Sequence, residues 1–514
     1  MPEVIDAQVT LDQEEAALGS DAASQSSDNL RWWILLTVII GTFLGRLDQT
    51  IVNLALPKII SQFGITVSAA GWIATAYILA NAIFVPIWGK LGDTLGRRKV
   101  YVLGLSIFII GSVLAAFSWN LSSMIFFRVI QAVAGSADYP TAMAILAVTF
   151  REGRERAQAL GIWSVSFAAA AVFGPLIGGP LIDNFGWRSI FLINLPIGLI
   201  GLAMVMLFVR ESVSGEKDKH FDWWGAITLG ISLSALVLVL DQGLTWGWGS
   251  VSSLFCYFVT TAFMLIFIWI EKDNPAAIVD LKFFKNSVFV NTLINNFVVF
   301  MGLTGCIFLL PIFAQTFLGF TATQTGYLFI PMAFMMVTAS PLGGSLTGRV
   351  PARYIIFAST MVAALGLYFF AHLDPRSTAW DIIWPLMIMA FGLGFGMAQR
   401  TNIIASVVPE HEIGIASSVL ALGRNIAGAF GIAIFGTILN NSIGSKILSI
   451  SRQSVIRVPG VVVDQTVAAL IILKAQVDSY SHVFVVAAIV VFVGGLLALQ
   501  IKVPNEKKIR VMVE

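Results

Sequence analysis

The chain has 514 residues, of which 57% are hydrophobic and only 12% are charged. So few charges cannot cover the surface of a soluble protein of this length, which excludes the soluble globular classes. The formal net charge of +2 points to no charged partner, and Cys256 and Cys306 both fall in apolar runs that indicate neither a compartment nor a disulfide.

Residues 1–30 differ in composition from everything that follows them. They contain seven acidic residues and no Lys or Arg, and they end in a Ser- and Ala-rich stretch. This composition is typical of a disordered segment. Because the basic region of a cleavable signal peptide is missing, we expect the first apolar run to act as an uncleaved anchor.

From residue 32 to residue 501 the chain repeats apolar runs of about 20 residues, each long enough to cross roughly 30 Å of hydrocarbon as a helix. Strand-period alternation is absent, which disfavours a β-barrel. We predict fourteen transmembrane helices, at residues 32–57, 69–89, 100–117, 121–148, 159–182, 188–209, 223–241, 250–270, 287–317, 323–347, 354–372, 379–408, 413–440 and 480–501.

The loop charges predict the orientation. With the N-terminus inside, the inner segments hold 20 of the 31 Lys and Arg residues, the outer segments hold seven, and four lie within spans. Since Lys and Arg concentrate in cytoplasmic loops, we expect a multi-pass protein of the cell membrane with both termini in the cytoplasm.

The spacing of the helices predicts an all-α fold of six, two and six transmembrane helices, built from repeated halves. An irregular polytopic scaffold is the alternative. The expected units are an acidic tail (1–30), a first bundle (31–210), a linker with two extra helices (211–286), a second bundle (287–503) and a short cytoplasmic tail (504–514). Within the second bundle, residues 441–479 form an outer segment, interpreted as an amphipathic hairpin or interfacial helices without an assigned function.

Asp48 lies deep in the first apolar run, where a charge is costly and usually faces a partner or a water-filled cavity. A carboxyl in such surroundings can gain and lose a proton as they change, so a proton is the first candidate ligand. Counting 1.5 Å per residue places Arg128 of the fourth span within a turn or two of the same depth. The alternative is a fixed ion pair that only holds helices together.

Two further motifs carry glycines at fixed spacing. The loop 89–99 reads GKLGDTLGRRK and includes Gly89, Asp93, Gly96 and Arg97, an arrangement that positive-inside charge alone does not explain. The fifth span contains GPLIGG, with Gly174, Pro175, Gly178 and Gly179. Proline kinks a helix and glycines allow a neighbouring helix to approach closely, although a generic kink would use the same residues.

Together with the run LDQTIVNLALP at 47–57, these motifs resemble the fourteen-helix drug:proton antiporter branch of the major facilitator superfamily, over about residues 32–503. The resemblance implies that Asp48 carries the proton and that Arg128 assists its release. It also implies that the loop 89–99 latches the cytoplasmic side and that the GPLIGG seam seals the two bundles. Arg128 lies in the run 128–135, which resembles the family's span-four motif but has Ala132 and Ala134 where that motif has glycines. Ala170 likewise stands where span five usually has a glycine, and Thr94 replaces a commonly basic residue. Residues 186–198 and 423–431 also resemble the family, but they support membership more than mechanism.

Other charges within the spans are not part of these motifs. Asp138 and Arg400 fall in the cytoplasmic third of spans four and twelve and have opposite charges. We interpret them as a possible inner gate that closes when the transporter faces outward. Arg400 binding an anionic substrate and two unrelated snorkelling side chains are the alternatives. Arg46, Asn295 and Asn296 are further candidates for the substrate cavity.

The sequence therefore predicts a proton-coupled antiporter that exports amphipathic drugs or toxic compounds by alternating access, acting as a monomer in the bilayer. The alternative is an exporter or flippase of a lipid or anionic metabolite. A membrane enzyme, a receptor and a channel are disfavoured, because the four histidines lie in loops or near span ends and show no metal-binding spacing. We expect protons and a small amphipathic molecule as ligands, no nucleic acid, and neither cofactor nor metal.

Overall fold

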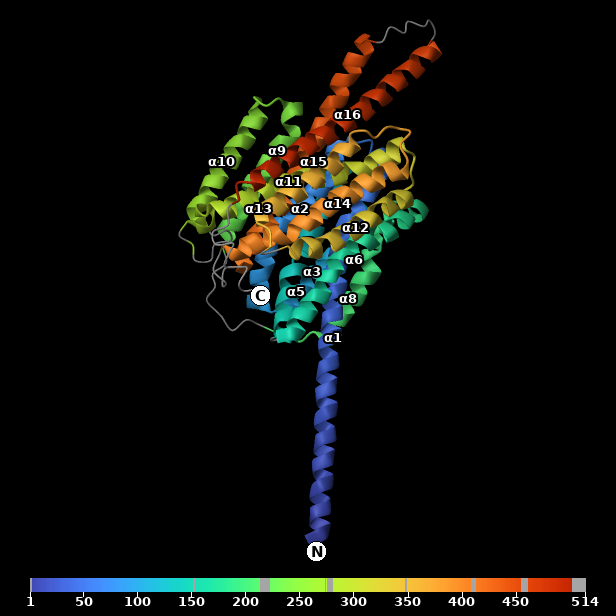
Figure 1. Cartoon of the computed structure of the whole chain (residues 1–514). Helices are drawn as coiled ribbons and strands as arrows, with labels where there is room; N and C mark the ends of the chain where they lie inside the picture. The colour runs from blue at the N-terminus through green and yellow to red at the C-terminus, as the bar shows by residue number, and fades with distance from the viewer. Residues whose placement is uncertain are drawn as a thin grey trace.

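The computed structural model describes residues 2–150, 153–212, 222–272, 274, 281–346, 349–407, 413–453 and 461–501, with side-chain detail from Leu30 onward. Within these ranges all regular elements are helices, which confirms the all-α class. Figure 1 shows one helical body with two projections at opposite ends. We call the end from which the first part of α1 projects the tail side. The other, from which α15 and α16 project, is the hairpin side.

The first bundle is formed by eight helical segments. They are α1 (Pro2–Phe63), α2 (Val67–Leu95), α3 (Arg97–Ala116), α4 (Leu121–Gly135), α5 (Asp138–Thr149), α6 (Gly153–Phe185), α7 (Ser189–Leu192) and α8 (Asn194–Phe208). Side-chain hydrogen bonds cap the N-termini of two of these helices. Thr66 accepts a hydrogen bond at the start of α2, and Asn120 and Ser123 form a reciprocal capping box at the start of α4.

The second bundle follows a separate helix pair, α9 (Trp223–Trp246) and α10 (Val251–Glu271), which packs through α9 on α2 and α15. A short 3-10 helix at Leu281–Lys285 leads into it. Its members are α11 (Ser287–Phe317), α12 (Ala322–Gly344), α13 (Ala352–Phe370), α14 (Ala379–Ser406), α15 (Ile413–Gln453) and α16 (Val461–Ala498).

The helix count agrees with the fourteen predicted spans. In the described part of the chain, 12 helices are long and apolar enough to cross a membrane. The remaining two predicted spans correspond to α4 with α5 and to α6. The predicted fourth span, 121–148, is not continuous, because the turn at Ser136–Ala137 separates α4 from α5.

Two segments project from the membrane body. Residues 441–479 continue α15 and α16 as a helical hairpin, with residues 454–460 outside the description (Figure 1). The first part of α1 is drawn as a helix that projects from the body. An isolated helix is marginal in water, so disorder of residues 1–30 in solution stays a prediction, as do the unit boundaries.

The apolar core is shared at one side of the molecule and divided at the other. On the hairpin side the largest buried cluster joins both bundles, through residues such as Ile51 of α1, Phe308 of α11 and Phe435 of α15. On the tail side the clusters stay within one bundle, around Val38 and Leu146 in the first. The bundles therefore pack tightly against each other at the hairpin side.

Candidate functional site

The predicted pair Asp48 and Arg128 is in direct contact at the centre of the first bundle. Arg128 Nη1 of α4 donates to Asp48 Oδ2 of α1, and the two side chains are only 2% and 1% exposed, respectively. Depth along the two helices was therefore a sound guide to the contact. A buried ion pair is stable only when its remaining polar atoms also find partners.

Two amides and a hydroxyl supply those partners. Gln131 Nε2 and Asn194 Nδ2 both donate to Asp48 Oδ1, at 2.9 and 3.0 Å. The same amides contact Ser112 Oγ at 2.6 and 3.1 Å, which ties α3 and α8 to the pair. The carboxylate thus accepts hydrogen bonds from two helices, α4 and α8, and is closed off from bulk water in this state.

Aromatic rings cover the cation. The Arg128 guanidinium lies 4.0 Å from the ring centroid of Tyr77 and 5.7 Å from that of Phe191. Its Nη1 also donates to Gln131 Oε1 at 2.6 Å, while Nε has no hydrogen-bond partner among the residues that the structure describes. Neutralising Asp48 would leave this guanidinium as an uncompensated buried charge, so the protonation of Asp48 and the local packing are linked. We call Asp48, Arg128, Gln131, Asn194 and Ser112 the Asp48 centre.

The GPLIGG seam of α6 lies between α1 and α12. A Cβ at Gly178 would come 2.9 Å from the Ile51 side chain, and one at Gly179 would come 2.8 Å from the backbone nitrogen of Thr323. From the α12 side, a Cβ at Gly326 would come 2.5 Å from the carbonyl oxygen of Pro175. The glycines therefore allow backbone contact between the two bundles on the hairpin side.

A charged contact closes the same side, and sequence reasoning did not find it. Asp183, at the end of α6, accepts hydrogen bonds from the backbone N–H groups of Ala322 and Thr323 at 3.1 and 2.8 Å. These are the first two N–H groups of α12, where the helix dipole favours an anion. Lys58 of α1 lies 3.3 Å from the same carboxylate and also donates to Ile182. We call this contact the Asp183 latch.

The latch carboxylate is ionised over the physiological range. Partial burial raises the pKa of Asp183, but the hydrogen bonds from Thr323, Ala322 and Thr321 outweigh burial and lower the pKa to about 2. A second cross-bundle bond, from Gln315 Nε2 to the carbonyl oxygen of Leu54 at 2.9 Å, lies nearby. Closure at the hairpin side thus rests on groups that do not titrate near neutral pH.

The loop 89–99 is organised around a turn that needs glycine. Gly96 has φ +109, and the backbone N–H groups of Arg98 and Lys99 donate to Glu211 at 3.1 and 3.2 Å. Glu211, which follows α8, thereby caps the start of α3. Arg97 Nη1 donates to the carbonyl oxygen of Ala144 near the end of α5 at 3.3 Å, and the side chain of Asp93 lies outside the described residues.

Asp138 and Arg400 are not in contact in this state. The Asp138 carboxylate accepts a hydrogen bond from Tyr101 at 3.1 Å and lies close enough to Arg46 to interact electrostatically. Arg400 donates to Asn295 and Thr360, both at 2.9 Å, within the second bundle.

The remaining cavity candidates divide between the bundles. Asn295 also donates to Gly494, and Asn296 donates to Leu420, so both amides serve internal packing here. Arg46 donates to Gln49 at 3.2 Å. Arg424, at 5.3 Å from the Phe300 ring centroid, lies within electrostatic range of Arg46 from the opposite bundle.

Sequence reasoning missed the partners that complete these sites. Ser112 and Asn194 gave a usable signal, since each is a polar residue in an otherwise apolar run. Asp183 and Glu211 gave none, because their partners are backbone groups on helices distant in sequence.

Comparisons with known proteins agree with this architecture. Residues 38–432 match the model of the Major Facilitator Superfamily. The chain is 31% identical over 408 residues to the multidrug resistance protein Stp of Mycobacterium tuberculosis, covering 79% of this chain and 76% of Stp. It is 30% identical over 414 residues to the multidrug export protein EmrB of Escherichia coli, covering 79% and 80% of the two chains.

Among solved structures, a bacterial homolog of the human lysosomal transporter Spinster, in an inward-facing and occupied conformation, aligns with a TM-score of 0.68. The alignment covers 92% of this chain and 96% of that one at 16% identity, which supports the fold alone. The family match covers well over half of the sequence, and the curated relatives are transporters. The chain is therefore a multi-pass membrane transporter, not an enzyme, and belongs to the Major Facilitator Superfamily.

Proposed function

We propose that this protein is a proton-coupled antiporter that exports amphipathic drugs or toxic compounds across the cell membrane. The observation that carries the proposal is the Asp48 centre, a fully buried carboxylate held by one cation and two amides. The names of relatives at 30–31% identity, which are multidrug transporters, support the class of substrate. The distribution of Lys and Arg supports a cytoplasmic tail side, with both termini there.

Asp48 carries the proton in this mechanism. When the carboxylate is ionised, Arg128 and the amides hold α1, α4 and α8 together. A proton that binds Asp48 removes the negative charge and leaves Arg128 buried without compensation, which costs several kcal/mol unless the helices rearrange. Proton binding therefore shifts the equilibrium between conformations, and the same linkage drives proton release when the helices return.

Alternating access uses the contacts between the bundles. The glycine seam of α6 and the Asp183 latch close the hairpin side in the present state and separate when that side opens. At the tail side, the loop 89–99 holds the ends of α3 and α5, with Gly89 and Gly92 packed on Pro140 and Thr141. Asp138 and Arg400 form an inner gate when the tail side closes, exchanging their present partners for each other.

The free energy released by one proton moving down its gradient is sufficient to drive export of one substrate molecule. A membrane potential of about 100 mV supplies about 2.3 kcal/mol per charge, and each unit of pH difference adds about 1.4 kcal/mol. One proton under such a gradient sustains roughly a hundredfold or greater concentration ratio of an uncharged substrate.

The test is transport by the Asp48→Asn variant in proteoliposomes with an imposed pH gradient. We expect it to insert and to lose gradient-driven transport. Asp374→Asn is the matched control, because it makes the same chemical change at an exposed carboxylate in the turn between α13 and α14. Full coupled transport by Asp48→Asn would exclude the assigned role.

Export of a lipid or an anionic metabolite is the second candidate function. The observation that favours it is the environment of the buried cation Arg400. Arg400 is 2% exposed, and its hydrogen-bond partners in the described residues are the neutral side chains of Asn295 and Thr360. A panel of ethidium, riboflavin and fluorescein, as cationic, neutral and anionic probes of substrate-stimulated proton flux, separates the two candidates.

A further inference from the structure

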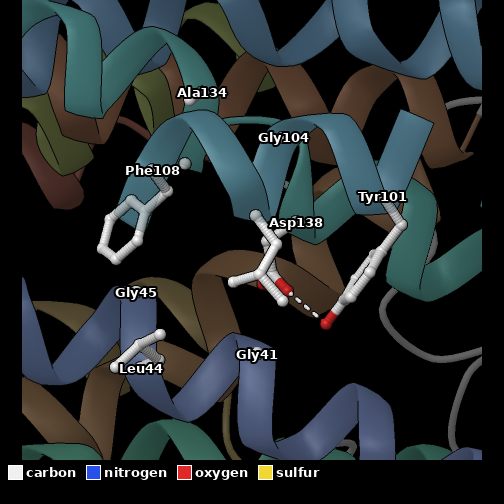
Figure 2. Close-up of a pocket in the computed structure, with 10 residues that line it drawn as sticks. Gly41, Leu44, Gly45, Tyr101, Gly104, Phe108, Ala134 and Asp138 are labelled. Carbon is white, nitrogen blue, oxygen red and sulfur yellow. Dashed lines mark hydrogen bonds between the residues drawn. The ribbon is translucent and has the colours of Figure 1, made fainter. Parts of the chain in front are cut away.

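A small cavity lies between α1, α3 and the break that separates α4 from α5 (Figure 2). It leaves about 20 Å³ for the centres of water molecules, which is room for about one water. Asp138 and Tyr101 are at one end, joined by their hydrogen bond, and Leu44 and Phe108 are at the other. The proposed function gives this cavity no role.

The cavity lies about one helical turn from the Asp48 centre, toward the tail side. Leu44 precedes Asp48 by four residues, Phe108 precedes Ser112 by four, and Gly135 follows Gln131 by four. Residues four apart lie on one face of a helix, one turn from each other. Three helices that hold Asp48 therefore line the cavity with the next turn of the same faces.

Asp138 is a titratable group at the tail-side end of this path. It is the first residue of α5, where the helix dipole favours the ionised form. The groups that face its carboxylate are Tyr101 from α3 and Thr42 and Arg46 from α1. Arg46 adds a positive charge that stabilises the ionised carboxylate. Asp138 is therefore placed to hold a negative charge when it is ionised and to accept a proton from a neighbouring donor.

The distance between Asp48 and Asp138 matches the length of a short chain of waters. A Cβ at Gly41 would lie 3.1 Å from Asp138 Oδ1, and Gly41 precedes Asp48 by seven residues, which is about 10 Å along α1. At about 2.8 Å per hydrogen bond, about three waters would span that gap. The cavity provides one position in this state. The Tyr77 hydroxyl, 3.3 Å from a Cβ at Gly135, adds a polar group at its edge.

We propose that Asp138 is the proton acceptor for Asp48 on the tail side, and that a short chain of waters, of which this cavity holds one position in the present state, passes the proton between them. The O–H bond of protonated Asp48 breaks and an O–H bond forms on Asp138, while the negative charge moves from Asp138 to Asp48. Asp138 then releases the proton to the tail-side solution. This inference rests on the proposed function, because it needs Asp48 as the carrier.

Asp138→Asn and Gly45→Ala test the relay by two routes. Asp138→Asn removes the acceptor. Gly45 lines the cavity with nothing within 4 Å of an added Cβ, so Gly45→Ala fits and displaces the water. Gly444→Ala is the control for the glycine change, since Gly444 is also helical and open but lies in the hairpin extension. Asp138→Glu is the control for the acid.

We expect Asp138→Asn to lower transport driven by a pH gradient at least tenfold, while binding of the same substrate to the purified protein stays within twofold of wild type. Gly45→Ala should slow gradient-driven transport severalfold, and both controls should keep it. Wild-type coupling in Asp138→Asn would overturn the relay. So would restored coupling in Asp138→Arg/Arg400→Asp, because arginine at position 138 cannot accept the proton. If either of these two results occurs while Asp48→Asn loses coupling, the relay is overturned but the proposed function is left intact.

Discussion

The Asp183 latch gives the sharpest prediction about conformational equilibrium. Asp183→Asn removes the charge and leaves one amide oxygen where two carboxylate oxygens accept N–H groups from Ala322 and Thr323. The closed hairpin side should lose stability relative to the open one. Nothing in the Asp48 centre contacts Asp183, so the change isolates the gate from the proton carrier.

The size of the effect follows from the contacts. Hydrogen bonds to a charged group contribute about 1.5–3 kcal/mol net, and an amide replaces part of that contribution. The Asp183 side chain is 22% exposed, and Lys58 is more exposed still, so the ion pair itself adds little. We expect a loss of about 1–2 kcal/mol, which is a roughly 5- to 30-fold rise in the ratio of open to closed hairpin side.

Spin labels across the hairpin side measure this ratio. Labels at Asn184→Cys on α6 and Asn441→Cys on α15 occupy exposed positions on opposite bundles, in a background with the buried Cys256 and Cys306 replaced by alanine. Double electron–electron resonance in lipid nanodiscs should show a larger population at the longer distance in Asp183→Asn. Asp374→Asn should leave the distribution unchanged.

The pH dependence provides a second check. Because the pKa of Asp183 is depressed to about 2, the latch contributes fully above the ordinary carboxyl pKa of about 4 and is lost as pH falls toward 2. The difference between Asp183→Asn and wild type should therefore be constant from pH 5 to pH 8. An unchanged distance distribution in the variant, or a difference that vanishes within that range, would refute the reasoning.

Three other changes have defined outcomes. Gly179→Ala places a methyl group against the α12 backbone, so it should destabilise the closed hairpin side by about 1–3 kcal/mol. The same spin-label distances should then shift. An unshifted distribution would show that the α6–α12 contact accommodates the methyl group without an energetic penalty. Arg128→Ala leaves Asp48 buried without its cation and should lower the melting temperature strongly. The double variant Arg128→Ala/Asp48→Asn should recover much of that loss. Equal melting temperatures of the two variants would argue against a stabilising ion pair between Asp48 and Arg128. Glu211→Gln removes the anion that caps α3, so it should lower the melting temperature slightly without changing substrate binding. A large loss of substrate binding would instead place Glu211 in the transport pathway.

The membrane fold was predictable because its signal is repetitive. Apolar runs of constant length predict spanning helices whatever their exact packing. The break at Ser136–Ala137 was missed although the sequence carries a signal for it, because Gly135, Ser136, Asp138 and Pro140 interrupt the apolar run there.

The site was predictable only in part. Asp48 and Arg128 were found because charges are rare in apolar helices and helix depth can be counted. The latch at Asp183 was hidden, because an acid near a helix end is common and its partners are the backbone N–H groups of α12. Contacts between a side chain and a distant backbone leave no pattern in a single sequence.

Proton release on substrate binding tests the central claim most directly. Purified protein in weakly buffered detergent solution near pH 7, with a pH indicator, is mixed with whichever of ethidium, riboflavin and fluorescein stimulates proton flux in proteoliposomes. If Asp48 exchanges its proton for substrate, wild-type protein and Asp374→Asn should release protons on binding. Asp48→Asn should bind the same probe and release none. Equal proton release from Asp48→Asn and wild type would contradict the account.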